Sequence, residues 1–119
     1  MLRLIRSFGY AFKGLWYATK TQFNFRIHLV ASVVTIAAGF YLHLQQNDWL
    51  WVSLAITAVL TAELLNTAIE VLTDRVSPEY NVKAGHVKDV AAGAVTVTVA
   101  FAVVVGLIIM LPKIIMLFK

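Results

Sequence analysis

The 119-residue sequence contains no cysteine and few charged residues. Without cysteine the chain can form no disulfide, no thiolate zinc site and no iron–sulfur cluster, and it has no cysteine nucleophile. Charged residues make up 13% of the chain and hydrophobic residues 61%, whereas an average soluble domain is about 25% charged and about half apolar. This composition fits a small soluble domain poorly and favours a membrane protein.

The sequence also lacks a glycine-rich phosphate loop, a nucleophile elbow and a dinucleotide-binding fingerprint. A nucleotide site in this chain would therefore differ from those of soluble kinases. Ten Lys and Arg against six Asp and Glu give a net charge of +4, which suits anionic phosphates, lipid headgroups or nucleic acid. Because the chain is so apolar, we expect lipid and nucleotide partners and no nucleic acid.

Three stretches of low charge are long enough to cross a bilayer, whose core of about 30 Å requires about 20 mostly apolar residues. They are residues 27–46, 49–72 and 90–111, and residues 73–89 connect the second to the third. Pro112 marks the end of the third stretch or a kink in it. We predict an all-α membrane protein with three transmembrane helices, in which residues 1–119 form a single domain.

Residues 1–20 have a different pattern, with basic and apolar side chains each recurring every three or four positions. This spacing predicts an amphipathic helix lying on the membrane surface. Membrane anchoring alone would explain it, and phosphate binding by some of its cations is the alternative. Eight of the ten basic residues lie within residues 1–26 and 73–89, which flank the predicted spans. Because basic residues beside membrane spans tend to stay in the cytoplasm, we expect these two segments, and the N-terminus, to be cytoplasmic.

Four polar residues in and after the second span are spaced three, four and four apart: Glu63, Asn66, Glu70 and Asp74. On a helix this spacing places them in one stripe. A carboxylate inside the membrane costs several kcal/mol (about 2.5 or more) unless it is protonated, paired or in a polar cavity. Such a group can act as a general base, and a second carboxylate nearer water can hold Mg²⁺. Proton or ion transport, or a neutral Glu63 bonded between helices, would also explain the acid.

Four polar residues at the end of the connection favour phosphoryl transfer over transport: Lys83, His86, Lys88 and Asp89. A cation and an acid beside a metal-binding carboxylate suit a nucleotide phosphate site. Alone, the Lys88–Asp89 pair is more typical of an interfacial anchor. His28 and His43 have no partner histidine at metal-ligand spacing, and we interpret both as interfacial polar residues.

Small residues at Gly39 and in residues 91–94 allow helices to approach closely in the membrane. Three helices alone enclose little space, so a site for a nucleotide and a lipid would be completed by another copy of the chain. We therefore expect a homo-oligomer.

Several motifs resemble the bacterial integral-membrane diacylglycerol kinase and undecaprenol kinase family: residues 62–70, Asp74-Arg75, residues 88–95, residues 9–15 and residues 24–28. Together they cover nearly the whole chain. The resemblance implies a homotrimer in the bacterial cytoplasmic (inner) membrane, with a surface helix and three transmembrane helices in each subunit. It further implies transfer of the γ-phosphate of MgATP to a lipid alcohol, in sites assembled between neighbouring subunits on the cytoplasmic side.

The resemblance also implies residue roles. Glu63 would be the general base and Asn66 would support it, Glu70 would bind the metal, and Asp74 would line the substrate cavity. The nucleotide contacts would be Arg3, Tyr10, Lys88 and Asp89.

One position departs from the family pattern. The family usually has a second metal-binding glutamate where this chain has Gln22. An amide oxygen can coordinate Mg²⁺ but adds no negative charge, so metal affinity or rate is expected to fall.

Residues 24–28 and 111–114 are more similar to the Gram-positive branch of the family, which suggests undecaprenol as the acceptor and undecaprenyl phosphate as the product. The alternatives are a diacylglycerol kinase that makes phosphatidic acid, a scaffold weakened in catalysis by Gln22, and a proton-coupled transport subunit.

Overall fold

The computed structural model describes all residues 1–119 and contains four helices and no strand. The helices are α1 (Leu2–Thr21), α2 (Phe23–Tyr41), α3 (Gln46–Val76) and α4 (Val82–Leu117). Helices α2, α3 and α4 are long and apolar enough to cross a membrane. The predicted all-α architecture with three potential transmembrane helices is therefore confirmed.

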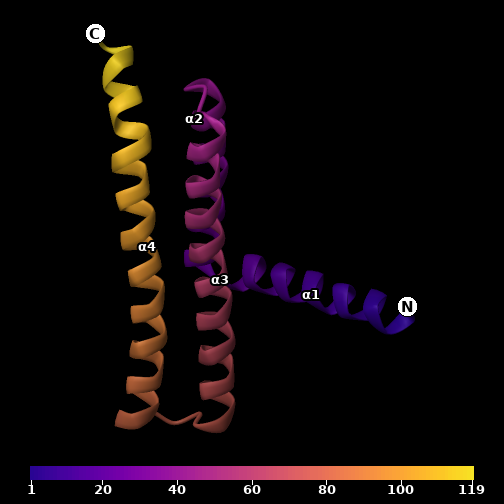
Figure 1. Cartoon of the computed structure of the whole chain (residues 1–119). Coiled ribbons are helices and arrows are strands. Elements are labelled where there is room, and N and C mark those ends of the chain that lie inside the picture. Colours follow the sequence, from indigo (N-terminus) through magenta and orange to yellow (C-terminus); the bar gives the residue numbers. More distant parts are fainter.

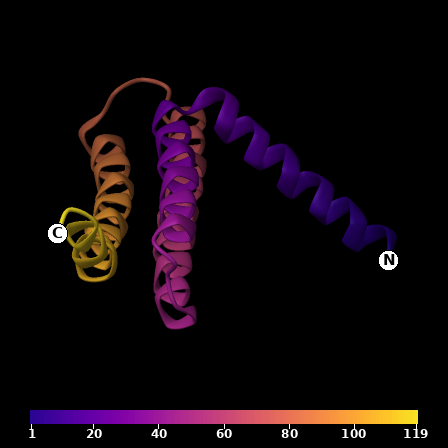
Figure 2. The ribbon, with the colours of Figure 1, turned by 90° about the horizontal axis from the view of Figure 1, so that it is seen from above.

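Helices α2, α3 and α4 form a bundle from which α1 projects (Figure 1). Helices α3 and α4 run antiparallel and make the most extensive contact, and α2 packs against α3. Seen from above, α1 points away from the bundle, so that the N-terminus lies far from the other helices (Figure 2). A single chain thus leaves open space beside the bundle.

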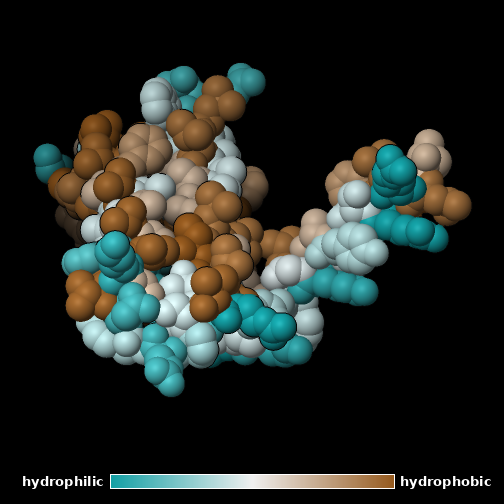
Figure 3. Space-filling model, turned by 90° about the horizontal axis from the view of Figure 1, so that it is seen from below, coloured by the Kyte–Doolittle hydropathy of each residue, from teal (hydrophilic) through white to brown (hydrophobic).

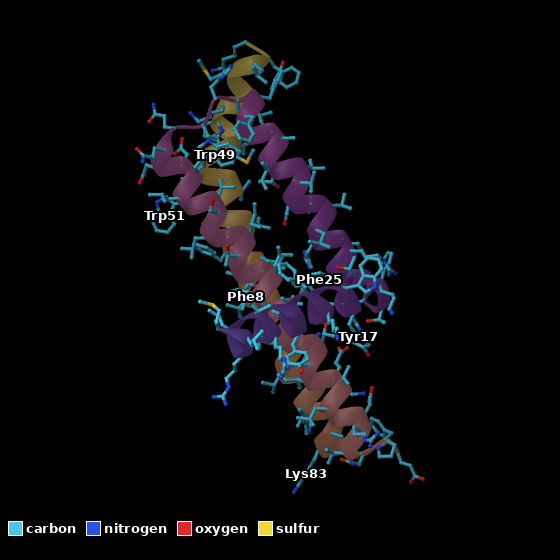
Figure 4. The ribbon with its side chains drawn as sticks, turned by 90° about the vertical axis from the view of Figure 1, so that its right-hand side faces the viewer. Phe8, Tyr17, Phe25, Trp49, Trp51 and Lys83 are labelled. Atoms are coloured by element: carbon cyan, nitrogen blue, oxygen red, sulfur yellow. The ribbon has the colours of Figure 1, made fainter.

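The corner between α1 and α2 is fixed by specific contacts. Helix α1 ends because Gln22 adopts an extended backbone, with φ −111° and ψ 109°. The Arg26 guanidinium then donates hydrogen bonds to the carbonyls of Thr19 and Lys20, at 3.1 and 3.0 Å. A cation at this place also interacts favourably with the helix dipole. Phe25 is 2% exposed at the same corner (Figure 4), so the start of α2 is firmly anchored.

The other helix ends have equally local causes. Helix α2 ends at Tyr41, before His43 adopts a left-handed backbone with φ 55°. Gln45 and Asp48 form a capping box at the start of α3. The Asn81 side chain caps α4 by accepting a hydrogen bond from the amide of Ala84, at 2.8 Å. Residues 82–89 are therefore helical, and only residues 77–81 connect α3 to α4.

Helix α4 does not end at Pro112, which was one of the two expectations for that residue. It continues to Leu117. Proline removes one backbone hydrogen bond, but the helix re-forms beyond it. Lys113 therefore lies within α4, with its Nζ 3.9 Å from Oδ2 of Asp48 at the start of α3.

Apolar packing within the chain is concentrated near the α2–α3 turn. Leu44, Val52, Ala55 and Val105 form the buried cluster there. Elsewhere little is buried, since only 13 of the 119 residues are classed as buried. Hydrophilic residues gather around the α3–α4 connection, and hydrophobic residues cover much of the sides of the helices (Figure 3). Such an apolar outer surface is stable in a bilayer and not in water.

Candidate active site

Glu63 is the buried acid at the centre of the candidate site. It lies on α3 and is 4% exposed. The next turn of α3 contributes Thr67, whose hydroxyl donates to the Glu63 backbone carbonyl at 2.9 Å and leaves the carboxylate free. A buried carboxylate is costly unless another polar group faces it.

The group that faces Glu63 is His28 of α2. Its Nε2 lies 3.3 Å from Oε1 of Glu63, and its side chain is 22% exposed. The interpretation of His28 as an interfacial polar residue was therefore incomplete, because the bundle turns it toward the acid. One sequence signal could have found this contact: Asn24 and His28 are four positions apart, which places two polar side chains on one face of a helix.

A cavity of about 440 Å³ opens beside this pair and is bounded by α2, α3 and α4. Its polar lining is Asn24 and His28 from α2, Glu63 and Asn66 from α3, and Thr96 from α4. The remaining lining is Ile27, Ala92, Val95 and Val99. Convergent polar groups in an otherwise apolar pocket are typical of a binding site.

Asn66 links the cavity to the next acid of the stripe. Its Nδ2 donates a hydrogen bond to Oε1 of Glu70, at 3.2 Å. Its Oδ1 is buried and has no hydrogen-bond partner. An unpaired amide oxygen and a carboxylate on successive turns are the kind of hard oxygen donors that Mg²⁺ takes. No group of three His, Asp or Glu residues lies close enough to hold a metal ion by itself.

A second polar cluster lies where α3 and α4 are joined. Lys88 Nζ contacts Oδ1 of Asp74 in an exposed ion pair. Lys88 and Asp89 line a cavity of about 340 Å³, whose other lining residues are Ser77, Pro78, Glu79, Tyr80, Ala84 and Gly85. Lys83 lies at the same end of the bundle (Figure 4). The spacing of the stripe puts this cluster roughly 16 Å from Glu63 along α3.

Three predicted site residues do not meet these clusters within one chain. Arg3 and Tyr10 are exposed on α1, the helix that points away from the bundle (Figure 2). The amide nitrogen of Gln22 donates only to Oγ1 of its neighbour Thr21, at 3.4 Å. No hydrogen bond or ion pair links any of the three to Glu70 or to Lys88.

A groove of about 860 Å³ separates α1 from α3. Its lining is mainly apolar and includes Leu15 and Ala18 of α1 and Leu64 and Val71 of α3, with Arg75 as its one charged residue. The groove is large enough for hydrocarbon, and it is separate from the polar cavity, because the two share no lining residue.

Comparison with known proteins gives consistent matches over most of the chain. The family model described as "Prokaryotic diacylglycerol kinase" matches residues 9–110. Undecaprenol kinase from Bacillus subtilis is 37% identical over 111 residues, which cover 93% of this chain and 90% of the relative. Diacylglycerol kinase from Synechocystis is 42% identical over 96% of this chain and 66% of the relative, and that from Escherichia coli K12 is 30% identical over 91% and 88%.

Proposed function

This chain belongs to the prokaryotic diacylglycerol kinase family and is an ATP-dependent lipid kinase of a bacterial membrane, and we propose that it phosphorylates undecaprenol with MgATP. The observation that carries the proposal is the buried Glu63, facing a polar cavity between three membrane-spanning helices. A structural acid would need no cavity, whereas a base needs room for the hydroxyl it deprotonates.

Glu63 is the proposed general base. Its carboxylate accepts the proton of the lipid hydroxyl as the lipid oxygen bonds to the γ-phosphorus of ATP. The bond from that phosphorus to the β,γ-bridging oxygen breaks, and ADP leaves with those electrons. A positioned base contributes about 10²- to 10⁴-fold to such a step. Asn66 would orient the reacting groups through its unpaired Oδ1.

Glu70 is the proposed metal ligand, with Gln22 as a second. The oxygen donors at Glu70 and Asn66 fit a hard cation. When bound, Mg²⁺ would neutralise part of the triphosphate charge. Glu70 itself would place the phosphates at the cytoplasmic end of the stripe. Asp74, the proposed substrate-cavity residue, lies one helical turn further along α3 and is exposed in its ion pair with Lys88.

Lys88 and Asp89 are proposed to bind the nucleotide, together with Arg3 and Tyr10. Lys88 carries a positive charge for phosphates and lies beside the cavity at the α3–α4 connection. Arg3 and Tyr10 lie on the projecting α1, so they could meet a nucleotide only if α1 reaches another copy of the chain.

A homotrimer with sites between subunits is therefore part of the proposal. A Cβ added at Gly93 would meet no atom within 4 Å, and the same holds for Gly9 and Gly14. Small residues with nothing packed on them are the surfaces that membrane helices use to approach a partner. We also propose that α1 is amphipathic and lies on the cytoplasmic surface, which would place the N-terminus and the site on the side that supplies ATP.

Undecaprenol is the proposed acceptor because residues 24–28 and 111–114 resemble the Gram-positive branch of the family. A relative that aligns with 93% of this chain is also named undecaprenol kinase. Diacylglycerol is the alternative, since other relatives are named diacylglycerol kinases.

The test is a side-by-side assay of ATP-dependent phosphorylation of undecaprenol and diacylglycerol in detergent micelles with Mg²⁺. We expect undecaprenol to be preferred, and Glu63→Gln to lower kcat by about 10²- to 10⁴-fold without changing the size of the assembled particle. Preference for diacylglycerol would reassign the acceptor. If a properly assembled protein phosphorylated neither lipid, the kinase proposal would fail and a scaffold weakened by Gln22 would replace it.

A further inference from the structure

His28 is the one group that contacts the Glu63 carboxylate. Its Nε2 is 3.3 Å from Oε1, and no side-chain hydrogen bond or other ion pair involves either carboxylate oxygen. A glutamate side chain has three rotatable bonds, so an uncontacted carboxylate can occupy several rotamers. The orientation of the proposed base therefore depends on a residue from another helix.

We propose that His28 is a positioning residue, whose Nε2–H holds the Glu63 carboxylate in the orientation that accepts the proton of the lipid hydroxyl. This inference rests on the proposed role of Glu63 as the base. Neutral imidazole carries its proton on one nitrogen, and a carboxylate facing Nε2 favours the tautomer with the proton there. The other oxygen of Glu63 is then left for the substrate.

The fold holds His28 in place from both sides. One turn before it, Phe25 is buried and Arg26 is bonded to the carbonyls that end α1. One turn after it, the Ser32 hydroxyl donates to the His28 carbonyl at 2.7 Å. Since α2 is anchored at this corner, the backbone that carries the His28 imidazole is held in place, and the longer Glu63 side chain can be oriented against it.

His28 also lines the cavity beside Asn24 and Thr96. The residue that faces the carboxylate is therefore also part of the cavity wall. A pair that served only to neutralise a buried acid would have no reason to share the wall of a cavity with two further polar residues.

Three variants test the inference by steady-state kinetics. His28→Leu removes the donor and keeps the bulk, and His28→Gln restores an N–H near the position of Nε2. Thr35→Ala is the matched control two turns away on α2, because the Thr35 hydroxyl donates to the carbonyl of Ala31 and not to His28. Because a reacting group misplaced by about 1 Å can lose about 100-fold in rate, we expect His28→Leu to lower kcat by that order. The KM for MgATP should stay within about twofold, His28→Gln should recover most of kcat, and Thr35→Ala should match the unsubstituted protein.

A second measurement is independent of turnover. In protein labelled with ¹⁵N-histidine, the Nε2–H signal of His28 should shift when Glu63 becomes Gln, while the signals of His43 and His86 stay unchanged as internal references. Unchanged kcat in a folded His28→Leu protein, or an unshifted His28 signal, would overturn the inference. Failure of the proposed function would be distinguishable from this, because the unsubstituted protein itself would then show no turnover in the lipid phosphorylation assay.

Discussion

The two ends of the bundle are built on opposite principles. Near the α2–α3 turn, which we call the packed end, the buried residues Leu44, Val52, Ala55 and Val105 fill the space between helices. Toward the α3–α4 connection, which we call the polar end, Glu63, Asn66 and His28 surround a cavity. Both ends use the same three helices.

The difference shows which end of the bundle stabilises the fold and which end carries the polar groups. At the packed end, side chains meet at van der Waals distance, as in the tilted contact of Phe40 and Trp49 with ring centroids 4.9 Å apart. At the polar end, an acid is buried with one partner and an amide oxygen with none. Unsatisfied polar groups destabilise a fold, so the packed end offsets what the polar end loses. Substitutions at the two ends should therefore affect different measurements.

After Glu63→Gln, the largest effect on activity should come from removing the negative charge of Glu70 at the proposed metal site. Losing a group that only orients a metal ligand lowers metal affinity by about 10- to 100-fold, so Glu70→Gln should raise the Mg²⁺ concentration for half-maximal rate by at least that factor. The matched variant Gln22→Glu adds a charge and should lower that concentration. Titrating activity with Mg²⁺ at saturating ATP measures both. Equal Mg²⁺ dependence in Glu70→Gln and the unsubstituted protein would remove Glu70 from the metal site.

The packed end should respond in stability instead. At Gly39 an added Cβ would lie 2.6 Å from Cη2 of Trp49 and 3.0 Å from Cδ1 of Leu44, so Gly39→Ala forces the Trp49 side chain or the turn to shift. Such overpacking costs about 1–3 kcal/mol, which should lower the thermal unfolding temperature in micelles and leave kcat of the folded fraction unchanged. Gly106→Ala is the control, because its Cβ would meet no atom within 4 Å. A Gly39→Ala protein as stable as the control would refute the close packing of this turn.

The smallest effect should come from the ion pair at the packed end. Lys113 Nζ and Asp48 Oδ2 are 3.9 Å apart, and both side chains are partly exposed. Pairs of this kind contribute about 0–1 kcal/mol. Lys113→Gln should therefore shift the unfolding temperature less than Gly39→Ala does, and leave both kcat and the Mg²⁺ dependence unaltered. A shift as large as that of Gly39→Ala would mean that polar contacts, as well as apolar packing, stabilise this end.

Much of this arrangement was predictable from the pattern of residues. Length and hydropathy predicted three potential transmembrane helices, because the thickness of a bilayer sets the length of a span. The spacing of Glu63, Asn66 and Glu70 predicted one polar stripe, and the hydrogen bond between Asn66 and Glu70 lies along it. Helix ends were harder. The start of α4 at Val82 is capped by Asn81, and α4 continues past Pro112 to Leu117 although proline removes a helical hydrogen bond.

The sequence by itself determined the elements that local physics controls. These are the apolar helices, the acids at fixed helical spacing and the absence of cysteine chemistry. Only the tertiary structure decided which residues meet across helices. Periodicity fixes the face of a helix on which a side chain lies, but not the face of another helix that it meets. Helix α2 packs against α3, and that packing brings His28 to Glu63 from 35 positions away in the sequence.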